Sequence, residues 1–84
     1  MNRPLSRSVR VYTAAGCHLC EAALEVIAKV REQTPFELEI VDIARDAELE
    51  ASYRERIPVV EVDDRPAFRY FVTADGLREW LERG

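Results

Sequence analysis

The short stretch Gly16-Cys17-His18-Leu19-Cys20 constrains this chain more than any other feature, because it joins a strand-like segment to a helical one. Two cysteines three residues apart in the first turn of a helix have Cα atoms roughly 5 Å apart, within the range for a disulfide. Unpaired N–H groups and the positive end of the helix dipole lie at that turn and favour a thiolate. Because the thiolate is the reactive form of cysteine, the pair predicts thiol–disulfide exchange.

Length and charge indicate one small globular domain. The chain has 84 residues, which predicts a single domain over residues 1–84 with an N-terminal tail at 1–8. Twelve basic and sixteen acidic residues are interspersed, so we expect no nucleic-acid partner. The apolar runs are too short to span a membrane and none resembles a signal peptide, so we expect a cytoplasmic monomer without a membrane partner. In a reducing cytoplasm, a lone Cys-x-x-Cys is more often catalytic or metal-binding than structural.

Hydrophobic patterning predicts the element order β-α-β-α-β-β-α, which is an α/β fold with a four-stranded mixed sheet flanked by helices. The strands are expected at residues 9–13, 36–42, 56–62 and 67–72, with a turn at 63–66. The helices are expected at about 19–33, 47–54 and 74–81. The first two strands would be parallel within a right-handed βαβ unit, whereas the last two would form an antiparallel hairpin.

The order of elements, with Cys-x-x-Cys opening the first helix and a proline opening the third strand, resembles the thioredoxin fold in its small glutaredoxin form. Tyr12-Thr13 followed by Cys17-His18-Leu19-Cys20 is similar to the glutaredoxin active-site stretch, and Ile57-Pro58-Val59 is similar to the cis-proline loop. The resemblance covers residues 9–81 and is greatest to a glutaredoxin-like branch with Gly-Cys-His-Leu-Cys-Glu and Arg-Ile-Pro-Val motifs. It implies a dithiol oxidoreductase that acts on protein or small-molecule disulfides and is restored by a thiol reductant or a reductase.

The expected site residues have distinct roles. Cys17 would be the nucleophile, and Cys20 would be the resolving thiol that releases the reduced partner. His18 would tune the thiolate by charge or by a hydrogen bond, or would simply be exposed. The resemblance implies that the Ile57–Pro58 bond is cis, lies against the cysteines and exposes the Ile57 backbone to a substrate strand. An ordinary trans proline at the start of a strand is the alternative.

Several neighbouring residues have simpler expected roles. Leu19 falls on the apolar stripe of the first helix or at its edge, with Ala22 and residues further along, and is expected to pack. Tyr12 and Trp80 are also expected to pack. The loop aspartates, Asp42 and Asp46, are expected to be caps or solvated charges rather than proton acceptors for a cysteine.

Departures from the glutaredoxin pattern bear on the reductant. Many glutaredoxins carry a lysine three residues before the first cysteine, where this chain has Ala14. The stretch Phe68-Arg69-Tyr70-Phe71-Val72 stands where many have the glycine pair of the glutathione site. Arg56, Arg69 and Asp75 are the candidates for restoring glutathione contacts. We therefore expect glutathione to be a poor reductant and no other cofactor to be required.

Two other classes of function stay open at this point. A metal or iron–sulfur site needs more ligands than two cysteines and one histidine, so it would require a dimer or external thiols. A non-catalytic protein-interaction module on the same fold is the second alternative. Gel filtration with metal analysis distinguishes the first alternative, and attempted reduction of a small disulfide distinguishes the second.

Overall fold

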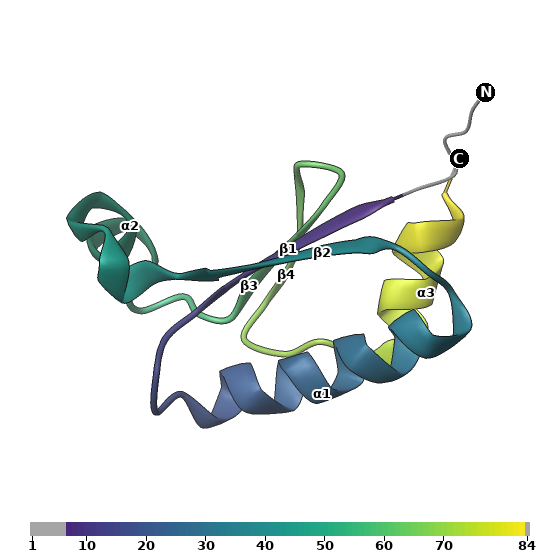
Figure 1. Ribbon diagram of the computed structural model, residues 1–84, viewed down its shortest axis with the longest axis horizontal. Coiled ribbons are helices and arrows are strands. Elements are labelled where there is room, and N and C mark those ends of the chain that lie inside the picture. The colour runs from purple at the N-terminus through teal and green to yellow at the C-terminus, as the bar shows by residue number, and fades with distance from the viewer. Residues whose placement is uncertain (1–6, 84) are drawn as a thin grey trace.

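The computed structural model describes residues 7–83, which build one four-stranded sheet with helices around it (Figure 1). The strands are β1 (Ser8–Thr13), β2 (Glu37–Asp42), β3 (Val59–Val62) and β4 (Arg65–Arg69). The helices are α1 (His18–Gln33), the 3₁₀ turn η1 (Ile43–Arg45), α2 (Ala47–Tyr53) and α3 (Ala74–Glu82). The strand order is β2-β1-β3-β4, with β1 parallel to β2 and the other pairs antiparallel. The predicted element order and α/β fold are confirmed; η1 is an addition to them.

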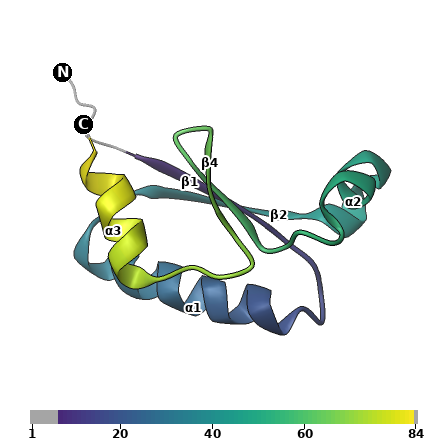
Figure 2. The ribbon, with the colours of Figure 1, turned by 180° about the vertical axis from the view of Figure 1, so that it is seen from behind.

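One face of the sheet carries the core. Helices α1 and α3 lie on the same side of the sheet, while α2 lies beyond the end of β2, as Figures 1 and 2 show. Alternate side chains of a strand point to the same face of the sheet. In β1 and β3 the side chains on the face toward α1 and α3 are apolar. The buried cluster consists of Val9, Val11, Ala23, Ile27, Val30, Phe36, Val60, Val62, Val72, Leu77 and Leu81. This layer fixes α1 against the sheet and thereby fixes where its first turn lies.

The buried stripe of α1 is rotated from the predicted one. Its buried positions are Cys20, Ala23, Ile27 and Val30. Leu19 is 39% exposed and Ala22 is also exposed, so the prediction that Leu19 packs is wrong. A cysteine behaves as a small hydrophobic residue, and Cys20 takes the inward position with the same helical spacing.

The hairpin between β3 and β4 is tighter than predicted. Its turn is only Asp63 and Asp64, which have φ values of 51° and 66°. Two consecutive residues at positive φ match the twist that a two-residue hairpin requires. The last strand therefore runs over Arg65–Arg69 and not over residues 67–72. Pro66 fits because β4 is an edge strand, where a missing N–H does not interrupt the sheet.

The remaining boundaries differ by small amounts. β3 begins at Val59, three residues later than predicted. β1 begins at Ser8, and the Arg7 guanidinium pairs with the Asp63 carboxylate. Arg7 and Ser8 therefore belong to the fold and not to the predicted tail. The rest of that predicted tail, residues 1–6, lies outside the described residues. Within residues 7–83 no helix combines the length and apolar character needed to cross a membrane.

Candidate functional site

Three segments meet at one end of the sheet. β1 ends there and leads into α1, which begins with the cysteines. Tyr12 is paired with Val59 in the antiparallel register of β1 and β3, so Pro58 lies at the same end. The carbonyl of Pro58 accepts the Tyr70 N–H at 2.9 Å, which brings the segment after β4 to this end as well. The cysteine turn, the proline loop and the β4–α3 segment therefore lie at the same end of the sheet.

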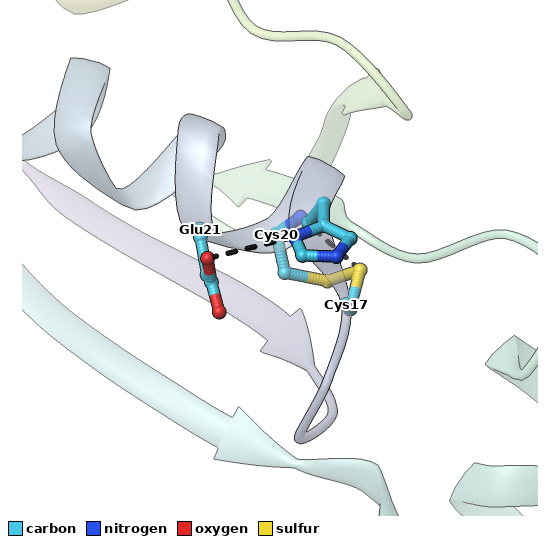
Figure 3. Close-up of a disulfide and its surroundings, with 4 residues drawn as sticks. Cys17, Cys20 and Glu21 are labelled. Atoms are coloured by element: carbon cyan, nitrogen blue, oxygen red, sulfur yellow. Dashed lines mark hydrogen bonds and ion pairs between the residues drawn. A yellow bond between two sulfur atoms is a disulfide. The ribbon is translucent and has the colours of Figure 1, made fainter.

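Cys17 and Cys20 form a disulfide at the start of α1 (Figure 3). Their Cα atoms are 5.2 Å apart, in agreement with the expected spacing. Cys17 is the N-cap of α1, and its Sγ accepts the backbone N–H of Cys20 at 3.1 Å. Cys20 is only 2% exposed, whereas Cys17 is half-buried. Cys17, at the N-cap, is therefore the more accessible residue of the pair.

His18 and Glu21 lie on the solvent side of this turn. The His18 side chain is 95% exposed, and its Nδ1 is 3.9 Å from Glu21 Oε1. An ion pair between two such exposed side chains is weak. His18 is therefore exposed, and its effect on the thiolate stays a prediction. Within residues 7–83, no three His, Cys, Asp or Glu side chains gather as ligands for a metal ion.

The proline loop follows α2 directly. The Ile57–Pro58 peptide bond is cis, as the resemblance implied, and Pro58 is fully buried. The Ile57 N–H donates to the carbonyl of Tyr53 at 3.1 Å. The expectation of an exposed Ile57 backbone is therefore wrong for its amide group, because the end of α2 uses that hydrogen. Pairing with an added strand would have to use the Ile57 carbonyl.

Tyr70 fastens the β4–α3 segment to the proline loop, and sequence reasoning did not single it out. Its φ of 68° lies in the left-handed region that bulky residues rarely occupy. Besides the bond to Pro58, its hydroxyl donates to the carbonyl of Glu55 at 2.7 Å. The Phe71 N–H donates to the carbonyl of Arg69 at 2.7 Å and closes a three-residue turn around Tyr70. The usual sequence signal for such a turn is glycine or asparagine, which this stretch lacks.

The candidate glutathione residues occupy two separate places. Arg56 and Arg69 line one open cavity of about 540 Å³, together with Tyr53. Asp75 lies in the first turn of α3 and pairs with Arg78 at 3.0 Å. The structure thus brings the two arginines together, but it places Asp75 in a different local contact.

The loop aspartates act as caps, as expected. Asp42 accepts the N–H of Ala44 at 2.9 Å at the start of η1. Asp46 accepts the N–H groups of Glu48 and Leu49 at 2.8 and 3.2 Å at the start of α2. These bonds satisfy backbone donors that the first turn of a helix leaves unpaired.

The aromatic residues pack, which also confirms the prediction for them. The Tyr12 ring stacks on Tyr53 with centroids 4.3 Å apart. Tyr12 is next to the core residue Val11 on β1, so its side chain points to the opposite face of the sheet. Burial raises the pKa of the Tyr12 hydroxyl, and the nearby charge of Glu61 raises it further. Trp80 packs partly buried against the core cluster, with the guanidinium of Arg83 4.4 Å from the centre of its ring.

Comparisons with known proteins agree with this geometry. The sequence matches the glutaredoxin-like domain family (DUF836) over residues 8–82. The glutaredoxin-like protein YDR286C homolog of Dictyostelium discoideum is 30% identical over 88 residues, covering 98% of this chain and 82% of that protein. The solution structure of protein Ne2328 from Nitrosomonas europaea is 30% identical with a TM-score of 0.79, over 98% of this chain and 99% of that one. The structure of Fasciola hepatica thioredoxin shares the fold. It is 22% identical with a TM-score of 0.61, over 90% of this chain and 78% of that one.

Proposed function

The chain belongs to the glutaredoxin-like domain family and has the thioredoxin fold, and on this basis we propose that it is a thiol–disulfide oxidoreductase. The observation that carries the proposal is the Cys17–Cys20 pair at the start of α1, in which Cys17 is partly exposed and Cys20 is buried. A cross-link between residues three positions apart closes a very short loop, where a disulfide stabilises a fold least. A purely structural disulfide is therefore a poor explanation for the pair. Reversible exchange needs one accessible cysteine, and Cys17 meets that need.

The proposed reaction begins from the reduced protein. The Cys17 thiolate attacks one sulfur of a disulfide substrate, forms a mixed disulfide and expels the other substrate sulfur as a thiolate. Cys20 then loses its proton and attacks the Cys17 sulfur, which releases the second substrate thiol and forms the Cys17–Cys20 disulfide. Two electrons pass from the protein to the substrate. A dithiol, or two thiols in succession, restores the reduced protein by the reverse exchange.

The surroundings of the two sulfurs favour this division of roles. The N–H of Cys20 points at Cys17 Sγ, and the positive end of the α1 dipole lies at the same place. Both effects stabilise a thiolate, which is the form of Cys17 that attacks a disulfide. Cys20 is buried and therefore kept from an external disulfide, but it lies within bonding distance of the Cys17 sulfur that it would attack.

Reduction of a small aliphatic disulfide, with dithiothreitol as the electron donor, tests the proposal. We expect the protein to raise the rate above the direct reaction between donor and substrate, because the Cys17 thiolate is the better nucleophile at neutral pH. The Cys17→Ser variant should return the rate to that background. Thiol product is measured by chromatography after an acid quench. A background rate with the intact, folded protein would instead support the non-catalytic interaction module.

A further inference from the structure

An open cavity of about 540 Å³ lies on the face of the sheet opposite to α1 and α3 (Figures 1 and 2). The core side chains of β3 are Val60 and Val62, so Val59 and Glu61, which alternate with them, point to this opposite face. Val59 and Glu61 both line the cavity. Its volume falls within the range of small-molecule sites, which is about 300–1,000 Å³.

Two arginines line this cavity and determine its charge. Arg56 follows the end of α2, and Arg69 ends β4, where it is paired with Val59. Neither arginine has an ion-pair partner within residues 7–83. The Glu61 carboxylate accepts a hydrogen bond from the Arg10 guanidinium at 2.7 Å, so its charge is already paired. The cavity therefore offers two free guanidinium groups, whose parallel N–H donors match the two oxygens of a carboxylate.

The other walls of the cavity are apolar and held in place. The Tyr53 ring lines one side and stacks on Tyr12 with ring planes 12° apart, so its orientation is fixed before a ligand binds. Val59, which is only 7% exposed, and Pro66 of the edge strand β4 line other parts. Fixed side chains lose little conformational freedom on binding. The walls therefore fit a molecule that carries an apolar body next to its charged group.

We propose that this cavity, termed the arginine cavity, binds a small organic acid, with its carboxylate held by Arg56 and Arg69 and its apolar body against Tyr53. Among the described residues that line the arginine cavity there is neither a cysteine nor Pro58. A molecule held inside it contacts no sulfur and is therefore a ligand, not the disulfide that is exchanged. The inference goes beyond the proposed function and does not depend on it.

Titration of the isotope-labelled protein with phenylpropionate, followed through its backbone amide resonances, tests the arginine cavity. We expect saturable shifts at Val59 and Glu61. The Kd should be about tenfold or more below that of the neutral phenylpropionamide, which lacks the charge that pairs with the arginines. It should also lie about tenfold or more below that of acetate, which lacks the apolar body.

Substitutions of the arginines locate the site. Arg56→Gln and Arg69→Gln should each raise the Kd for phenylpropionate about fivefold, the usual upper limit for one exposed ion pair. Arg65→Gln is the matched control and should leave the Kd unchanged. Arg65 lies on the same strand as Arg69 but is paired with the core residue Val62, on the other face of the sheet. All three arginines are exposed, so the folded amide spectrum should persist in every variant.

Three results would overturn the proposal. The first is the absence of saturable shifts, and the second is equal binding of acetate and phenylpropionate, which would leave only surface charge. The third is tighter binding of S-methylglutathione than of phenylpropionate, which would assign the arginines to glutathione. The titrations use the protein with its Cys17–Cys20 disulfide intact, so a failure of disulfide exchange would not affect them.

Discussion

Replacing Cys20 with serine should make the protein accumulate as mixed disulfides with its substrates. The Cys17 thiolate remains able to attack, but the thiol that resolves the intermediate is absent. Cys17→Ser should accumulate none, because the buried Cys20 cannot reach a substrate disulfide. Non-reducing electrophoresis and mass spectrometry after incubation with a disulfide-bonded protein measure the trapped species. Equal trapping by both variants would refute the assignment of roles.

The burial of Cys20 requires a folding control. Serine in this position places a hydroxyl where the cysteine is 2% exposed, and an unsatisfied hydroxyl costs about 1–3 kcal/mol in mutational data. Cys20→Ala removes the resolving thiol without adding a polar group, so it should trap the same mixed disulfide. Trapping by serine but not by alanine would point to disturbed packing as the cause.

With glutathione as reductant, turnover should be about 10- to 100-fold less efficient than that of a glutaredoxin that has the lysine and the glycine pair. The reason is that glutathione should bind this protein about 10- to 100-fold more weakly. Ala14 replaces the lysine, and Asp75 is engaged with Arg78. One flexible arginine at an exposed site contributes only about 0–1 kcal/mol to holding a carboxylate. Reduction coupled to glutathione reductase, run beside dithiothreitol, measures the difference.

A matched variant sharpens the glutathione experiment. Ala14→Lys restores the missing positive charge and should raise the rate with glutathione while leaving the rate with dithiothreitol unchanged. Turnover of the parent protein with glutathione equal to that of a typical dithiol glutaredoxin would contradict the prediction. In that case Arg56 and Arg69, which line the same cavity, would form the glutathione site. Alanine at either position should then abolish the rate with glutathione.

The features that local sequence signals specify were predictable. Strand alternation before Cys17 and helical spacing after it placed the disulfide correctly, because both patterns lie in the segments that directly flank the cysteines. The caps at Asp42 and Asp46 follow from side-chain chemistry that acts two or three residues away. The element order followed from the same local patterns, as did the parallel pairing of the first two strands and the antiparallel pairing of the last two.

The features that depend on tertiary contacts were not predictable. Leu19 and Cys20 are adjacent on the helix, so both fit the apolar period, and only packing against the sheet decides which one is buried. The conformation of Tyr70 depends on bonds to Pro58 and Glu55, which are distant in sequence. The Asp63-Asp64 turn is a weaker local signal than Asn-Gly, so the start of β4 was placed too late.

The reduction potential of the Cys17–Cys20 pair tests the central claim most directly. The protein is equilibrated with glutathione buffers of fixed thiol-to-disulfide ratio, which cover the predicted range, and with dithiothreitol buffers, which cover more negative potentials. Its free thiols are then alkylated and counted by mass spectrometry. Our account predicts a reversible two-electron transition between about −270 and −120 mV, the range of thioredoxin-fold oxidoreductases. A midpoint below about −300 mV, where structural disulfides lie, would contradict it.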